Sequence, residues 1–104
     1  MKEVTVQELK KMIDEGEDFQ LIDCREPHEF ENGNLKGELI PLGEIMANTD
    51  KISRDKKVVI HCRSGARSGT AVNQLETMEG FDNLFNLKGG IKAWHEQIDP
   101  SVQY

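Results

Sequence analysis

A cysteine with two arginines close behind it is the feature of this sequence best suited to chemistry. Arg63 follows Cys62 directly, and Arg67 comes shortly after it. The thiolate is the reactive form of cysteine, and nearby positive charges favour it. Gly65 allows the backbone to turn tightly, so that several N–H groups can face one anionic atom. The pattern predicts a nucleophilic cysteine in an anion-binding loop rather than an inert core thiol with solvated arginines.

The flanking residues predict a strand before the cysteine and a helix after it. Residues 58–60, Val-Val-Ile, are typical of a strand buried on both faces of a parallel sheet. From Ser64 to Gly80 the apolar residues recur at helical spacing, at Ala71, Val72, Leu75 and Met78. Cys62 is therefore expected at a helix start, where free N–H groups and the helix dipole favour an anion.

The composition predicts one acidic domain. A length of 104 residues suits a single domain over residues 1–104, and 37% hydrophobic residues suffice for one core. A net charge of −6 argues against a nucleic-acid or anionic-membrane surface. Two cysteines without a signal peptide do not indicate a disulfide framework, and no apolar run is long enough for a membrane span. We therefore expect a protein of the reducing cytoplasm.

The rest of the chain alternates predicted helices with predicted strands. A capping box at Thr5 and Glu8 begins an amphipathic helix that runs to Gly16. Further strands are predicted at residues 19–23, 39–40 and 84–87, and helical segments at residues 27–30, 42–46 and 89–100. The alternation indicates an α/β fold with a parallel sheet and right-handed crossovers. Ligands bind such sheets at the carboxyl ends of the strands, where Asp23, Cys24 and Cys62 are expected.

Three segments together resemble the rhodanese family of sulfurtransferases. Residues 21–30, LIDCREPHEF, are similar to the opening motif of the family, and residues 62–68, CRSGARS, to its active-site loop. Residues 87–94, LKGGIKAW, are similar to its closing motif. The resemblance implies a rhodanese-like α/β fold, with a five-stranded parallel sheet flanked by helices on both faces.

The resemblance also implies the reaction. The Cys62 thiolate would take the sulfane sulfur of a small anionic donor such as thiosulfate, release sulfite and carry a persulfide. A thiol or cyanide would then accept the sulfur, and a protein could also serve as donor or acceptor. No cofactor is implied. No metal is expected, because the three histidines do not have ligand-like spacing.

The loop after the cysteine supplies the predicted substrate-binding residues. These are Arg63, Ser64, Gly65, Ala66 and Arg67. Their backbone N–H groups would stabilise the persulfide anion. Arg63 is the candidate for binding the anionic donor, whereas Arg67 could do the same or tie the loop to the domain. Ser64 and Ser68 could donate hydrogen bonds to the loop or the sulfur, or cap the helix.

Several other residues have a structural and a functional interpretation. Cys24 stands where the family more often has an apolar residue, so it is either a small buried side chain or a resolving thiol for Cys62. Asp23, Arg25 and Glu26 are expected to pair with one another and fix the loops rather than to touch substrate. His61 and Trp94 are expected to pack in the core.

Two other functions fit part of the pattern. A phosphatase or an arsenate reductase also holds an anion beside a cysteine and an arginine, but the segment between Cys62 and Arg67 is one residue shorter than that chemistry uses. No aspartate on the loop could act as its general acid. The second is a rhodanese-fold carrier or partner-binding module without free turnover, which the fold alone does not exclude.

Overall fold

The computed structural model describes all residues, 1–104, and places five strands in one parallel sheet. The strands are β1 (Glu3–Val4), β2 (Gln20–Asp23), β3 (Glu38–Leu39), β4 (Val58–His61) and β5 (Leu84–Leu87). Their order is β1-β5-β4-β2-β3, and all four neighbouring pairs are parallel. The expected five-stranded parallel sheet is thus confirmed, with β4, the strand before Cys62, at its centre.

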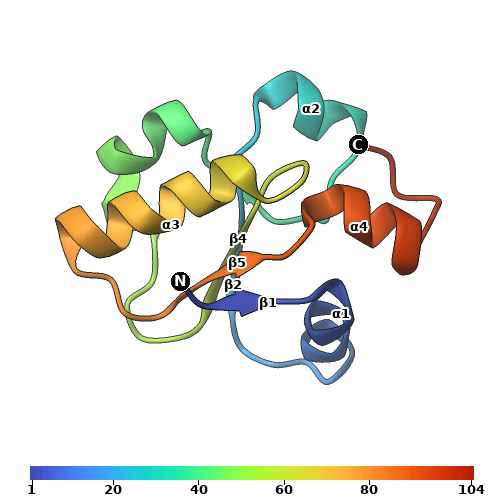
Figure 1. Ribbon diagram of the computed structural model, residues 1–104, viewed down its shortest axis with the longest axis horizontal. Helices are drawn as coiled ribbons and strands as arrows, with labels where there is room; N and C mark the ends of the chain where they lie inside the picture. Colours follow the sequence, from blue (N-terminus) through green and yellow to red (C-terminus); the bar gives the residue numbers. More distant parts are fainter.

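Helices cover both faces of this sheet. They are α1 (Val6–Asp14), α2 (Pro27–Asn32), the 3-10 segment η1 (Leu42–Lys51), α3 (Ala66–Glu79) and α4 (Gly90–Gln97). Figure 1 shows α3 and the green η1 segment on one side of the strands, and α1 and α4 on the other. The short α2 lies at the end of the molecule where the chain also terminates. The predicted arrangement of helices on both faces is confirmed.

Two apolar clusters, one on each face, form the core. Beneath α3 and η1 the buried residues include Ile22, Ile60, Ala71, Val72 and Leu75. Beneath α1 and α4 they include Val6, Leu9, Val59, Leu87 and Trp94. All four residues of β4 are buried, because alternate side chains of this central strand enter opposite clusters. This explains why residues 58–60, at the start of β4, are all apolar.

Local sequence signals locate several helix ends. Thr5 Oγ1 accepts the Glu8 N–H at 3.1 Å while Glu8 Oε1 accepts the Thr5 N–H at 2.8 Å, so the predicted capping box begins α1. Pro27 occupies the first turn of α2, where its missing N–H costs nothing. Gly80 ends α3 in the left-handed conformation at a φ of 68°. Each of these predictions is confirmed.

The main differences from the expected elements are the following. The two-residue strand β1 was not expected, because so short an edge strand has no periodicity to detect. The helix expected from Ser64 begins at Ala66, because the preceding residues form the turn around Cys62. The segment predicted at 42–46 extends to Lys51, and α4 ends at Gln97, short of the proline at 100.

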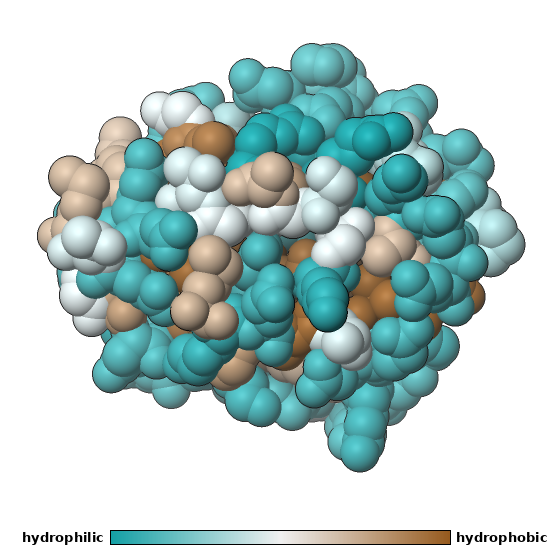
Figure 2. Space-filling view, viewed as in Figure 1, coloured by the Kyte–Doolittle hydropathy of each residue, from teal (hydrophilic) through white to brown (hydrophobic).

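The exterior of the molecule is mainly polar. Figure 2 shows a largely hydrophilic face on which hydrophobic side chains appear in small, separate areas. Ile13 and Met78 are among the exposed apolar residues, at 44% and 68%, although both continue apolar helical patterns. Both stand near the end of a helix. None of the helices combines the length and hydrophobicity that crossing a bilayer requires.

Candidate active site

Cys62 lies where β4 ends and the chain turns into α3, as its sequence context predicts. The turn depends on Gly65, because its φ of 109° lies in a region that residues other than glycine rarely adopt. The cysteine is 1% exposed and is a free thiol. The loop therefore curls over the sulfur and shields it from most of the solvent.

Two backbone N–H groups and one hydroxyl converge on the Cys62 sulfur. The N–H of Gly65 lies 3.2 Å from Sγ and that of Ser68 lies 3.4 Å from it. Ser68 Oγ lies 3.3 Å from the same atom. Of residues 63–67, Gly65 donates to the resting sulfur, and Ser68 adds two further donors. Of the two roles considered for Ser68, the structure shows contact with the sulfur.

Asn86 of β5 completes this hydrogen-bonded cluster and was not identified from the sequence. Its Nδ2 donates to the Gly65 carbonyl at 3.1 Å, and its Oδ1 accepts from Ser68 Oγ in a short hydrogen bond. The single hydroxyl proton of Ser68 can serve either Asn86 or Cys62, but not both at once. The only signal in the sequence is one asparagine within an otherwise apolar strand, Leu84–Leu87. The structure shows that this asparagine is buried.

Hydrogen bonds favour the thiolate form of Cys62. A hydrogen bond from the Cys24 thiol contributes most to lowering the pKa of Cys62 well below the usual range of a thiol, and Ser68 and Gly65 add to the effect against the opposing cost of burial. The pKa of Cys24 is correspondingly raised, chiefly by that same hydrogen bond to Cys62. Neutral donors, among them the expected N–H groups at the start of the helix, therefore have a larger effect on this cysteine than the two arginine charges.

The two arginines of the loop point to different partners. Arg67 forms a bidentate ion pair with Glu29 of α2, with nitrogen–oxygen distances of 2.7 and 2.9 Å. This pairing lowers the pKa of Glu29 to about 2. Arg63 is exposed, forms no ion pair and has its guanidinium carbon 5.1 Å from the centre of the Tyr104 ring. Ser64 and Ala66 are exposed on the outer side of the loop.

A buried ion pair fixes the loop after the neighbouring strand β2. Arg25 is fully buried, and its Nε and Nη2 contact the Asp23 carboxylate at 2.8 to 3.1 Å. Arg25 Nη2 also donates to the carbonyl of Gly33 at 2.7 Å. His61 lies against the same carboxylate at 3.7 Å, and burial lowers the pKa of its ring. Asp23 and Arg25 are thus paired as expected, whereas Glu26 caps α2 instead.

The start of α4 holds the end of β4 in place. The N–H of Ile91 donates to the Cys62 carbonyl and that of Lys92 to the Arg63 carbonyl, both at 3.0 Å. This contact requires glycine at position 90, because a Cβ there would collide with both carbonyls. Gly90 also has a φ of 62°, which a side chain would strain. The start of α4 therefore holds the first residues of the loop after β4 in place.

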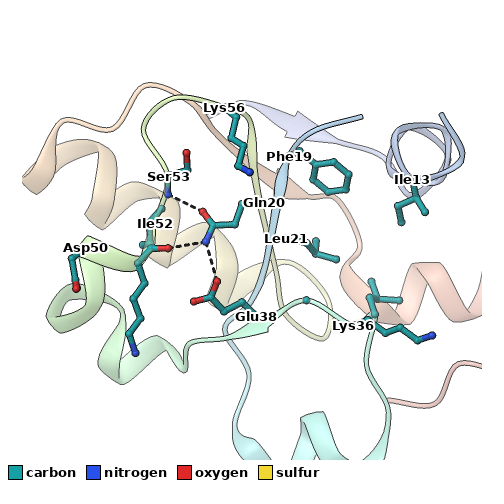
Figure 3. Close-up of a pocket in the computed structure, with 13 residues that line it drawn as sticks. Ile13, Phe19, Gln20, Leu21, Lys36, Glu38, Asp50, Ile52, Ser53 and Lys56 are labelled. Carbon is teal, nitrogen blue, oxygen red and sulfur yellow. Dashed lines mark hydrogen bonds between the residues drawn. The ribbon is translucent and has the colours of Figure 1, made fainter. Parts of the chain in front are cut away.

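No cavity opens beside the cysteine. The largest, of about 730 Å³, lies at the start of β2, between β3 and the end of η1 (Figure 3). Gln20 organises its wall by donating to Glu38 Oε1 and to the Lys51 carbonyl and by accepting the Ser53 N–H. Cys62 lines none of the three cavities of the molecule. The site is a shallow loop around one sulfur atom rather than a deep pocket.

Known proteins share this sequence pattern. The model of the Rhodanese-like domain family matches residues 5–97. A "Sulfurtransferase" of Allochromatium vinosum is 37% identical over 98% of this chain and 95% of its own length. The uncharacterised protein YqhL of Bacillus subtilis is 42% identical over 76% of this chain. The putative sulfur carrier protein YrkF of the same organism is 29% identical over 88% of it.

Several of these relatives are longer than the chain. The matched part covers 63% of YqhL and 50% of YrkF. It covers 36% and 26% of two further relatives, a Rhodanese-like/PpiC domain-containing protein of Arabidopsis thaliana and the probable adenylyltransferase/sulfurtransferase MoeZ of Mycobacterium tuberculosis. Similarity to those proteins therefore concerns one part of each of them.

Solved structures share the fold. The Rhodanese-like domain protein of Staphylococcus aureus superposes with a TM-score of 0.84 at 30% sequence identity, over 99% of this chain and 97% of that one. A rhodanese-related protein of Thermoplasma volcanium gives a TM-score of 0.83 at 28% identity. The family match along the sequence and the near-complete structural agreement lead to one conclusion: this chain belongs to the Rhodanese-like domain family.

Proposed function

We propose that this protein is a sulfurtransferase that moves a sulfane sulfur through a persulfide on Cys62. The observation that carries the proposal is the convergence of two backbone N–H groups and the Ser68 hydroxyl on the sulfur of Cys62. Donors so placed stabilise a thiolate before transfer and an anionic sulfur during it. The family, and the relative named a sulfurtransferase, support the same reaction.

The reaction has two half-steps. The Cys62 thiolate attacks the sulfane sulfur of thiosulfate, the sulfur–sulfur bond of the donor breaks, and sulfite leaves with the electron pair. Cyanide or a thiolate then attacks the outer sulfur of the persulfide, and the Cys62 thiolate returns. Another persulfide, on a small molecule or a protein, can replace thiosulfate as the donor. No cofactor has a role in either half-step.

The two arginines have different roles in this proposal. Arg63 attracts the anionic donor, because its side chain is exposed and free of carboxylates. Arg67 ties the loop to α2 through Glu29. Of its two possible roles, donor binding and attachment of the loop to the domain, we assign it the second. Ser64, Gly65 and Ala66 complete the loop, of which Gly65 gives the sulfur its N–H. In this proposal residues 1–104 form one rhodanese domain. Its two free thiols suit a reducing compartment such as the cytoplasm.

Intact-mass measurement tests this function. The purified protein is incubated with thiosulfate, freed of excess donor and weighed before and after addition of cyanide. We expect a gain of about 32 Da, one sulfur atom, that cyanide removes, and no gain on the Cys62→Ser variant. If neither thiosulfate nor a low-molecular-weight persulfide adds mass to the wild-type protein or to Cys24→Ser, the proposed function is wrong.

A carrier that passes its sulfur to one protein is the second candidate. The absence of a cavity at Cys62 favours it, since a protein surface can approach a shallow loop. The likeness to YrkF, named as a putative sulfur carrier, supports the same alternative. Steady-state measurement of thiocyanate separates the two: a sulfurtransferase forms many equivalents per protein from thiosulfate and cyanide, whereas a carrier that is loaded only by its partner protein forms almost none.

A further inference from the structure

Cys24 is the direct neighbour of Cys62 on the adjacent strand. In the pairing of β2 with β4, Asp23 stands opposite His61, so the next residue of each strand is a cysteine. The N–H of Cys24 donates to the His61 carbonyl at 2.9 Å and continues the ladder beyond the strands. Both cysteines belong to the same apolar cluster beneath α3, and both are 1% exposed. Their side chains therefore lie on the same face of the sheet.

This placement allows a bond between the two sulfurs. Neighbouring strands run about 4.8 Å apart, and a disulfide joins residues whose Cα atoms are roughly 4.4–6.8 Å apart. The register places Cys24 opposite Cys62, and both side chains enter the same buried cluster, so the two cysteines are neighbours within it. Both are free thiols in the reduced protein.

The Cys24 thiol is held in its protonated form, because hydrogen bonding with Cys62 and burial both raise its pKa. It becomes a nucleophile only as its proton passes to the outer sulfur of the persulfide. Cys24 lies beside Cys62 in the same buried cluster, so its thiol needs no diffusional encounter to meet the reactive sulfur. An intramolecular thiol in contact has a large kinetic advantage over one from solution.

We propose that Cys24 is a resolving cysteine that releases the sulfur of the Cys62 persulfide as hydrosulfide, an activity that rests on the proposed function. The Cys24 sulfur bonds to Cys62 Sγ, the bond from Sγ to the outer sulfur breaks, and the Cys24 proton passes to the departing sulfur. The outer sulfur is reduced to hydrosulfide while the two cysteines are oxidised to a disulfide. A dithiol reductant then reopens the disulfide by two thiol–disulfide exchanges.

The net reaction belongs to a class different from sulfur transfer to a nucleophile. Thiosulfate and a dithiol give sulfite, hydrosulfide and an oxidised dithiol. No external oxidant is needed, because the sulfane sulfur accepts the two electrons. Hydrosulfide release by this path requires both cysteines, whereas transfer to cyanide requires Cys62 alone.

The experiment follows a loaded protein without any acceptor. The reduced protein is loaded with thiosulfate under anaerobic conditions, passed through a desalting column and sampled over time for intact mass and for trapped sulfide. We expect the gain of about 32 Da to decay to a species about 2 Da lighter than the reduced protein, with one equivalent of sulfide. Peptide mapping without reductant is expected to find Cys24 linked to Cys62, a readout that needs no variant.

The matched variant is Cys24→Ser, which keeps a hydrogen-bond donor but cannot form the disulfide. It is expected to load and to retain its extra sulfur at least about tenfold longer than the wild-type protein. Equal rates of sulfur loss from both proteins, or disulfides only between two copies of the chain, would overturn the proposal. A wild-type persulfide that persists without releasing sulfide would overturn it while leaving the proposed function intact.

A failure of the proposed function looks different. In that case neither the wild-type protein nor Cys24→Ser gains a sulfur atom from thiosulfate or from a low-molecular-weight persulfide. If Cys24→Ser fails to fold, the peptide map of the wild-type protein still decides the linkage.

Discussion

At the level of single residues, the character of Cys62 depends on a few short contacts rather than on net charge. Its sulfur lies within 3.4 Å of the N–H groups of Gly65 and Ser68 and also receives the Cys24 hydrogen bond. A protein with a net charge of −6 would on average disfavour one more anion. Directed donors in a buried site outweigh that average, because the surrounding dielectric is low.

The pH dependence of alkylation tests this account. Because the pKa of Cys62 is lowered, its reaction with iodoacetamide is expected to reach its plateau below neutral pH. Cys24→Ala removes the donor that contributes most, so the midpoint should move upward by about one pKa unit. The matched variant Cys24→Ser keeps a donor and should shift less. Equal midpoints in the wild-type protein and Cys24→Ala would contradict the assigned cause.

At the level of elements, three segments hold the active-site loop from different sides. The helix α2 contributes Glu29, β5 contributes Asn86, and the start of α4 contributes two N–H donors. Each of these contacts joins residues far apart in the sequence. The loop is therefore positioned by the assembled fold, not by its own conformation alone.

The ion pair between Glu29 and Arg67 has a defined pH dependence. The pKa of Glu29 is lowered from 4.5 to about 2 in the folded protein, so its contribution to stability is present above pH 4.5 and disappears as the pH falls towards 2. Glu29→Gln is expected to lower the free energy of unfolding by ~1 kcal/mol at pH 7, a modest value because both partners are partly exposed.

Urea denaturation at several pH values measures this effect. The difference between Glu29→Gln and the wild-type protein should shrink steadily below pH 4.5. The matched control is Glu31→Gln, which changes an exposed carboxylate of the same helix without an ion pair. A pH-independent difference for Glu29→Gln would show that its effect does not come from the ion pair.

Glycine at position 90 gives a second test at this level. Gly90→Ala places a methyl group against the Cys62 and Arg63 carbonyls at a positive φ, so we expect a loss of ~2 kcal/mol or more and slower sulfur loading. Gly43→Ala is the matched control, because a Cβ there meets no atom within 4 Å. Stability by urea denaturation and loading by intact mass are the measurements. An unchanged loading rate in Gly90→Ala would refute the supporting role of α4.

At the level of the whole molecule, the site sits on a central strand that is covered on both faces. The α3 face contains the two cysteines, and the opposite face is closed by α1 and α4. Cys62 therefore depends on packing on the face that its own side chain does not touch. The apolar residues of α1, Val6, Leu9 and Met12, are buried because this helix packs on that face.

Two substitutions on α1 measure this dependence. Leu9 is fully buried and Ile13 is 44% exposed, although both follow the apolar spacing of the helix. Leu9→Ala should cost about 2–5 kcal/mol, whereas Ile13→Ala should cost well under about 1 kcal/mol. Denaturant midpoints provide the comparison. Similar losses for the two variants would mean that the second cluster does not support the sheet as described.

The agreement between sequence and structure is closest where local chemistry decides the outcome. The apolar residues 58–60 of β4, the capping box of α1 and the left-handed Gly80 are each specified by adjacent residues. The family resemblance likewise rests on contiguous motifs, and it correctly implied the five-stranded sheet. Such signals can be read along the chain, because side-chain periodicity and glycine conformation are local properties.

The sequence by itself determined the fold class, the family and the position of Cys62 between a strand and a helix. The tertiary structure alone decided which groups surround the sulfur: Ser68 in addition to Gly65, Asn86 bound to Ser68, and Cys24 on the neighbouring strand. It also decided that Arg67 pairs with Glu29. These partners come from different strands and helices, so their directions and distances exist only once the sheet and its covering helices are packed together.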